Sequence, residues 1–264
     1  MRASRLIPKS HPRYHSLVTR EELMKHLETG VVAKAGLIAH GRGEAFDYLI
    51  GEETIEPALR AIKAAACALL LAERPVISVN GNAAALAGGW IIKLAETVNA
   101  KIEVNLFYRT KEREKAIESL LKSLGAKEVL GVDERFQTTI PELMSERRRV
   151  DSRGIVIADV VLVPLEDGDR TEALRRMGKT VIAIDLNPLS RTARAASITI
   201  VDNIVRAMPK LVEEASRLKH MSRDELRSIL SGYDNNAVLS EVLEYMANRL
   251  KKLAQETLRA QSKW

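Results

Sequence analysis

The chain has 264 residues, of which 46% are hydrophobic and 29% are charged, and its formal net charge is +6. This composition supports a packed core and excludes an intrinsically disordered chain. The positive charge favours anionic partners, but aromatic residues make up only 4% of the chain. Because single-stranded nucleic acid binds by stacking on aromatic rings, we expect phosphate-bearing small molecules and no nucleic acid.

Cys67 is the single cysteine of the chain and lies in an alanine-rich stretch. A lone cysteine excludes an internal disulfide framework, and we expect this one to be buried in a helix. The basic amino terminus is not followed by a long apolar segment, so we expect a cytoplasmic protein without a membrane partner. No metal-binding motif is present, and any Mg²⁺ would be held by phosphates.

Residues 1–73 predict an arm followed by helices. Pro8 and Pro12 indicate that residues 1–18 form an ordered arm or loop rather than a helix. Thr19 has the character of a helix N-cap, and Gly30 ends that helix. Two further helices are expected, at residues 34–50 and 53–72.

From residue 74, short apolar runs alternate with amphipathic stretches. Strands are predicted at residues 75–79, 101–106, 128–130, 159–163, 180–184 and 197–201. Helices are predicted at residues 83–98, 111–124 and 168–177, and from residue 203. This alternation indicates an α/β, Rossmann-like, doubly wound and mostly parallel sheet of about six strands, with added N- and C-terminal helices.

The whole chain, residues 1–264, is predicted to be a single α/β domain. Residues 1–73 form its N-terminal arm and helices, residues 74–219 its Rossmann-like core, and residues 220–264 its C-terminal helices. The C-terminal helices exceed what one sheet needs. We expect them to pack on the sheet or to form an oligomer interface.

Ligands of open parallel sheets bind beyond the carboxyl ends of the strands. At one such end, Asn80-Gly81-Asn82 favours a cradle for a phosphate or carboxylate at a helix start, or else a tight turn capped by Asn82. This segment has neither the three-glycine dinucleotide fingerprint nor the P-loop pattern. Their absence argues against a standard nicotinamide site and a P-loop kinase.

Three other strand ends carry polar side chains. Asp185 and Asn187 suit ribose and adenine, and Arg191 suits phosphate, although the segment also has the character of an Asx turn. Asp202 precedes a helix and is either a ligand contact or only an N-cap. Arg109 follows the second strand and is either a ligand contact or a solvated arginine.

Two segments outside the sheet also gather basic side chains. Lys9, His11 and Arg13 lie in a frame stiffened by prolines, and His40 and Arg42 lie among the glycines of residues 36–43. Glycines permit close approach to an anion. The alternative is that both segments are solvated polar loops.

Several blocks of sequence resemble the archaeal phosphopantothenate synthetase family, which is also called 4-phosphopantoate–β-alanine ligase. The blocks are Ile-Pro-Lys-Ser-His-Pro-Arg-Tyr at residues 7–14, the glycine-containing stretch 33–49, residues 80–82 and residues 185–193. The resemblance spans most of the chain and weakens in the last helices. The first block is specific to this family.

The resemblance implies an ATP-dependent ligase that condenses (R)-4-phosphopantoate with β-alanine in coenzyme A biosynthesis. Its products would be 4′-phosphopantothenate, AMP and diphosphate, formed through an acyl-adenylate. It also implies a homodimer. The implied ATP contacts are Arg20, Arg42, Asp185, Leu186, Asn187, Arg191, Thr192, Asn203 and Ile204.

For catalysis we expect Arg42 and His40 to lie beside the triphosphate or the reacting carboxylate, with His40 or Glu44 as the base for the amine. The residues expected to bind substrate are Lys9, His11, Arg13, Lys34, Asn80, Asn82 and Arg109. An alternative is a non-catalytic adenine-nucleotide-binding or sensing protein. Sheet topology alone also suggests a nicotinamide or flavin enzyme, against which the missing glycines argue.

Overall fold

The computed structural model describes residues 7–165 and 168–261. Its centre is a five-stranded sheet, in which every neighbouring pair of strands is parallel and the order is β2-β1-β5-β6-β7. The strands are β1 (Pro75–Val79), β2 (Lys101–Val104), β5 (Val160–Pro164), β6 (Thr180–Ile184) and β7 (Ile198–Ile200). The Rossmann-like α/β prediction is therefore confirmed.

The order of the strands places the ligand crevice. Numbered within this sheet alone, the order is 2-1-3-4-5, a common doubly wound arrangement. The chain passes from β1 to β2 on one side of β1, and later enters β5 on the other side. The switch in direction therefore lies between β1 and β5, and a ligand is expected beyond their carboxyl ends.

The sheet has five strands rather than the expected six or so. The predicted strand at residues 128–130 is reduced to one parallel bridge between Leu130 and Glu103. A separate antiparallel pair, β3 (Gln137–Thr139) and β4 (Arg149–Asp151), was not predicted. Strands of three residues are too short to show a reliable alternation of apolar and polar side chains.

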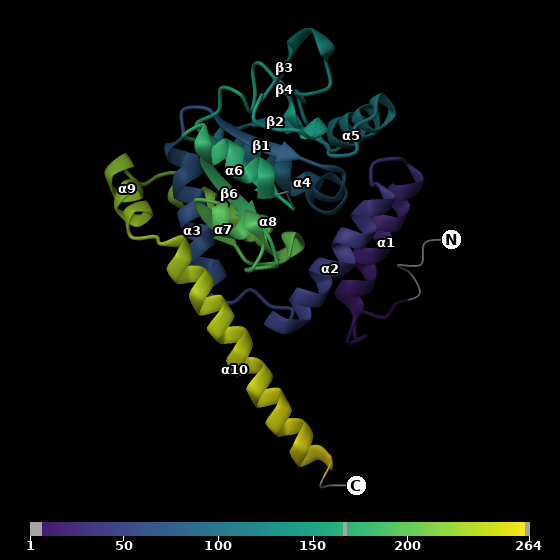
Figure 1. Cartoon of the computed structure of the whole chain (residues 1–264), viewed down its shortest axis with the longest axis vertical. Coiled ribbons are helices and arrows are strands. Elements are labelled where there is room, and N and C mark those ends of the chain that lie inside the picture. Colours follow the sequence, from purple (N-terminus) through teal and green to yellow (C-terminus); the bar gives the residue numbers. More distant parts are fainter. Residues whose placement is uncertain (1–6, 166–167, 262–264) are drawn as a thin grey trace.

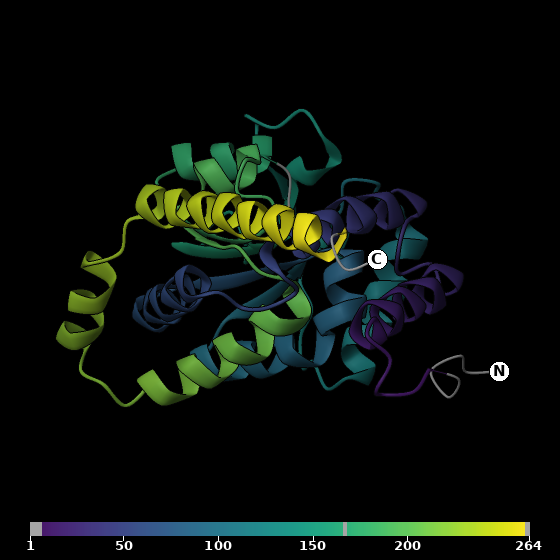
Figure 2. The ribbon, with the colours of Figure 1, turned by 90° about the horizontal axis from the view of Figure 1, so that it is seen from below.

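Helices cover both faces of the sheet (Figure 2). Because successive strand residues point to opposite faces, Ile77 and Ile182 belong to one core, while Val161 and Val181 belong to the other. The first core includes α3 (Glu56–Leu71), α4 (Gly81–Val98), α5 (Lys111–Ser123) and α8 (Ile204–Leu218), and the second includes α6 (Gly168–Arg176). Cys67 is buried in α3 with a free thiol, as expected.

The N-terminal helices are α1 (Tyr14–Glu28) and α2 (Lys34–Ile50), which lie together to one side of the sheet (Figure 1). The prediction for α1 was wrong at its start. The helix begins at Tyr14, and Thr19 lies inside it with its hydroxyl donating to His15 O at 2.8 Å. Pro12 does not oppose this start, because a proline before the first turn removes no helical hydrogen bond.

The remaining elements complete the described chain. They are α7 (Arg191–Ala195), α9 (Arg223–Ser231), α10 (Asn235–Gln261) and 3₁₀ turns at Glu134–Phe136 and Glu146–Arg148. Leu239, Val242 and Met246 of α10 pack in a third apolar cluster with Ile50 of α2. Beyond them α10 extends away from the body of the molecule (Figure 1). None of the described helices has both the length and the apolar character of a membrane span.

Candidate active site

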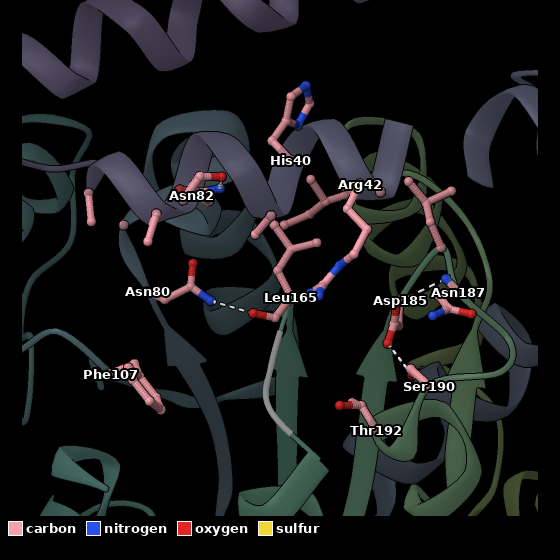
Figure 3. Close-up of a pocket in the computed structure, with 18 of the residues that line it drawn as sticks. His40, Arg42, Asn80, Asn82, Phe107, Leu165, Asp185, Asn187, Ser190 and Thr192 are labelled. Carbon is pink, nitrogen blue, oxygen red and sulfur yellow. Dashed lines mark hydrogen bonds between the residues drawn. The ribbon is translucent and has the colours of Figure 1, made fainter. Parts of the chain in front are cut away.

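A cavity of about 590 Å³ lies between α2 and the carboxyl ends of β1, β5 and β6 (Figure 3). Among the described residues that line it are four arginines and a single carboxylate: Arg42, Arg113, Arg147, Arg191 and Asp185. Apolar side chains, including Leu86, Leu106 and Leu165, complete the wall. A cavity with this excess of positive charge suits a ligand that carries several negative charges.

The end of β6 forms one side of the cavity. Asp185 accepts hydrogen bonds from Ser190 Oγ at 2.5 Å and from the backbone N–H of Asn187 at 2.9 Å. Burial raises the pKa of Asp185 above its ordinary range, opposed by these bonds and by the charge of Arg42. Asn187 Oδ1 accepts from Leu189 N at 2.9 Å, so the expected Asx turn is present as well.

The starts of two helices, α7 and α8, extend this side of the cavity. Ser190 caps α7 by accepting from Ala193 N, and the exposed Arg191 pairs with Glu172 at 2.9 Å. Asn203 caps α8, so Asp202, the alternative cap, does not fill that role. Arg191, Thr192, Asn203 and Ile204 all line the cavity, as do Leu186 and Asn187.

A buried charge network fixes the position of Asn203. Its Nδ2 donates to Asp47 Oδ2 at 2.8 Å, and Arg206 bridges Asp47 and Asp202 at 2.5 and 2.6 Å. Burial raises the pKa of Asp202, against the charge of Arg206 and a hydrogen bond from Thr54. These contacts connect α2 to α8 across the cavity wall.

The switch point between β1 and β5 is held by Asn80. Its Nδ2 donates to Pro164 O and Leu165 O, each at 3.0 Å, and its Oδ1 caps α4 by accepting from Ala83 N. Asn82 is therefore not the cap. Its Nδ2 donates to Gly36 O at 2.8 Å and connects α4 to α2. Both asparagines line the cavity.

The two side chains of α2 that were expected to be catalytic point in different directions (Figure 3). Arg42 extends toward the strand ends, between Leu165 and Asp185, whereas His40 points away from them. Burial lowers the pKa of His40, and this favours its neutral imidazole at neutral pH. Its Nε2 is buried and has no hydrogen-bond partner in the described structure.

Glu44 lies close to His40 and binds α1. Arg20 donates to Glu44 Oε2 at 2.6 Å, and Ser16 donates to Oε1 at 2.5 Å. Burial alone would raise the pKa of Glu44, but these bonds outweigh burial and hold the pKa below its ordinary range. Arg20, an expected ATP contact, does not line the cavity and is engaged by Glu44 in this structure.

Five expected substrate contacts lie outside the cavity wall. Lys9, His11 and Arg13 are exposed on the segment before α1, and Lys34 is exposed at the start of α2. Arg109 is neither a cavity residue nor the solvated arginine of the alternative. It is buried in an ion pair with Glu114 and donates to Arg149 O at 2.8 Å, so it binds the protein itself.

Sequence reasoning missed Arg113, Arg147, Phe107 and Tyr108, which also line the cavity. Arg113 belongs to a charged helix and Arg147 to a run of three arginines, and both patterns are typical of solvated surfaces. For Arg113 a signal was available. It lies in the first turn of the helix after β2, and the start of that helix faces the same edge of the sheet as the other strand ends.

No three His, Cys, Asp or Glu side chains converge to hold a metal ion within residues 7–165 and 168–261. Asp185 is the single carboxylate of the described cavity lining. This donor set fits a Mg²⁺ ion that takes most of its ligands from phosphates and water, because Mg²⁺ needs only one or two protein carboxylates. It does not fit a metal caged by protein.

Comparison with known proteins identifies relatives of this chain. Residues 57–249 match the family described as phosphopantothenate/pantothenate synthetase. A 4-phosphopantoate–β-alanine ligase of Thermococcus kodakarensis is 60% identical over 251 residues, 95% of each chain, and that of Thermococcus onnurineus is 60% identical over 94% of this chain and 95% of its own. The ligase of Methanosarcina mazei is 53% identical over 95% of this chain and 98% of its own. The chain belongs to the phosphopantothenate/pantothenate synthetase family.

Proposed function

We propose that the chain is an ATP-dependent ligase that joins 4-phosphopantoate to β-alanine. The observation that carries this proposal is a cavity at the switch point of the sheet whose described lining has four arginines and one carboxylate, in a chain 60% identical to ligases of that name. Both ATP and 4-phosphopantoate are polyanions, and one cavity has to neutralise them together.

The nucleotide is proposed to bind at the β6 side of the cavity. Asp185 would accept hydrogen bonds from ribose hydroxyls, and Asn187 would contact the adenine edge; both residues line the cavity. Arg42, Arg191 and Thr192 would contact the phosphates, with Asn203 and Ile204 at the start of α8. Arg20 is assigned to ATP by family resemblance, and it would have to exchange Glu44 for a phosphate.

The reaction has two proposed steps. The carboxylate of 4-phosphopantoate attacks the α-phosphorus of ATP, which forms an acyl-adenylate and releases diphosphate. The amine of β-alanine then attacks the acyl carbon, AMP leaves with the bonding electron pair, and the amine loses a proton. Arg42 would neutralise charge in the first step, because it points into the cavity beside the β6 end.

The base that takes the proton from β-alanine is proposed to be His40 or Glu44. Neutral His40 has a free ring nitrogen and is able to accept a proton. Because its side chain points away from the strand ends, it would have to turn toward the cavity or act through water. Mg²⁺ would supply charge neutralisation on the ATP phosphates and would take most of its ligands from phosphates and water.

The enzyme is further proposed to be a cytoplasmic homodimer. The second half of α10 supports the dimer, because Leu250, Leu253 and Leu258 are 46%, 40% and 69% exposed on a helix that extends beyond the body. A row of leucines on a projecting helix is typical of a helix that packs against a second copy.

The test is an assay of AMP and diphosphate release. Purified protein receives ATP and Mg²⁺ with 4-phosphopantoate, with and without β-alanine, and then with unphosphorylated pantoate instead. We expect continuous release of AMP, diphosphate and 4′-phosphopantothenate in equal amounts only when the phosphorylated acid and the amine are both present. Binding of ATP without AMP release would support the alternative of a nucleotide-sensing protein.

A further inference from the structure

The cavity has a second positive region that ATP at the β6 side would not occupy. Figure 3 shows Asn80 and Phe107 on one side of Arg42, and Asp185 and Asn187 on the other. The first side is formed by the ends of β1 and β2, the start of α4 and two arginines, Arg113 and Arg147. Neither Arg113 nor Arg147 was among the sequence-predicted site residues.

Arg113 is held in place by main-chain carbonyls and not by an acid. Its Nη2 donates to Val31 O at 3.2 Å, and its Nη1 donates to Tyr108 O. Its Nε is buried without a hydrogen-bond partner, and no carboxylate of residues 7–165 or 168–261 forms an ion pair with it. A partly buried guanidinium without a neutralising acid is expected to attract an anion.

Arg147 adds a second charge to the same region. It is 5% exposed, and its Nη1 donates to Asn105 O at 3.0 Å. Asn105 in turn donates from Nδ2 to Arg147 O at 3.1 Å, so the arginine is anchored at the end of β2. The pKa of Arg113 is lowered, first by burial and then by the charge of Arg147. The charge of Arg147 is therefore close enough to act on Arg113, and both side chains line the same part of the cavity.

The start of α4 adds backbone donors. Gly81 and Asn82 line the cavity, and their N–H groups belong to the first turn, where no intrahelical acceptor exists. Packing here leaves no room for a side chain at Gly81. A Cβ atom at this position would lie 2.1 Å from Val31 O and 3.0 Å from Arg113 Nη2. The helix start and Arg113 are thus held in close contact.

The two charges of 4-phosphopantoate fit this arrangement. Its carboxylate has to meet the α-phosphate of ATP, and its phosphate is at the opposite end of the carbon chain. With the nucleotide at the β6 side, the phosphate would point toward Arg113. Leu86, Leu106 and Leu165 also line the cavity and offer apolar surface for the dimethyl-substituted carbon of the acid.

We infer that Arg113, with Arg147 and the first turn of α4, binds the phosphate group of 4-phosphopantoate and selects the phosphorylated acid over pantoate. This inference rests on the proposed function of the cavity. It assigns to Arg113 a binding and specificity role that the amino-terminal basic residues Lys9, His11 and Arg13 were expected to fill.

The experiment measures steady-state AMP release by the full-length enzyme and its variants Arg113→Gln and Arg113→Lys. Removing one partner of a buried, hydrogen-bonded charge pair is expected to raise the KM for 4-phosphopantoate about thirtyfold or more in Arg113→Gln. The KM for ATP should stay within about twofold, because the nucleotide side is unchanged. Arg113→Lys keeps the positive charge but loses the planar guanidinium with its paired N–H donors. Its KM for 4-phosphopantoate should therefore lie between the values of the parent enzyme and of Arg113→Gln.

Lys115→Gln is the matched control, because Lys115 is exposed on the same helix. It should behave as the parent enzyme does. Thermal unfolding of each variant checks that it is folded. If Arg113→Gln does not fold, the KM of Arg113→Lys still decides the test. An unchanged KM for 4-phosphopantoate in both variants, or a rise confined to the KM for ATP, overturns the inference. Failure of the parent enzyme to release AMP overturns the proposed function instead.

Discussion

Arg42 is the arginine of α2 that extends toward the strand ends, and its surroundings explain why. It lies near Asp185, whose pKa its charge lowers against the effect of burial. Glu44, two residues further along the same helix, points instead to Arg20 and Ser16 of α1. Neighbouring positions of one helix thus serve two different tasks, because successive helical residues are about 100° apart.

At the residue scale, we predict that Arg42→Ala lowers the rate of AMP formation about a hundredfold or more and leaves the fold intact. The reason is that one charged contact to the transferred phosphoryl group is lost, while the largely exposed side chain contributes little to packing. Initial-rate assays and thermal unfolding measure the two effects. Parent-like turnover in the folded variant would remove Arg42 from the mechanism.

Elements join at buried polar side chains, and Glu103 of β2 is one of them. It is fully buried and accepts hydrogen bonds from Asp151 N at 2.9 Å and Ile155 N at 2.6 Å. It therefore ties the edge strand of the main sheet to the chain around β4. Burial raises its pKa from 4.5 to about 7, although the two N–H donors oppose that shift.

At the element scale, this raised pKa predicts a pH-dependent stability. The folded state keeps a proton on Glu103 that the unfolded chain releases between pH 4.5 and about 7. The free energy of unfolding should therefore fall as the pH rises through this window, by on the order of 3 kcal/mol for this group. Urea unfolding at about pH 5 and about pH 8 measures the change.

Glu103→Gln is the control for this prediction, because an amide does not titrate. The variant is less well matched to two N–H donors, but this cost is the same at both pH values. We expect the difference in unfolding free energy between the two pH values to shrink in the variant. A difference equal to that of the parent protein would mean that Glu103 is ionised throughout.

The whole molecule consists of a doubly wound core, a two-helix cover over the strand ends and a projecting C-terminal helix (Figure 1). The cover forms one wall of the cavity, and the core forms the other. The first half of α10 is fixed by Leu239, Val242 and Met246, whereas its second half has leucines exposed to solvent. Such a helix end gains stability when a second copy covers it.

At the scale of the whole molecule, we predict that the double variant Leu250→Glu and Leu253→Glu is monomeric. Light scattering during size-exclusion chromatography should give twice 29.3 kDa for the parent protein and 29.3 kDa for the variant. Lys251→Glu, on the same exposed stretch, should remain dimeric. A monomeric parent protein would contradict the proposed dimer.

The sequence by itself determined the class of the fold and much of the β6 side of the cavity. Apolar runs predict β1 and β6 at the residues where they lie, and the pattern of residues 34–50 predicts α2. These predictions hold because hydrophobic periodicity and strand-end position are local properties of a chain. The same rule brought Asn80, Asp185 and Asn203 to the cavity wall.

Only the tertiary structure decided which arginines face the cavity. Arg109 and Arg113 are four residues apart, yet Arg109 is paired with Glu114 and Arg113 opens onto the cavity. Arg147 comes to the same cavity from the 3₁₀ turn Glu146–Arg148, where its Nη1 donates to Asn105 O. Ion pairing and burial depend on neighbours in space, and no spacing of residues along the sequence encodes those neighbours directly.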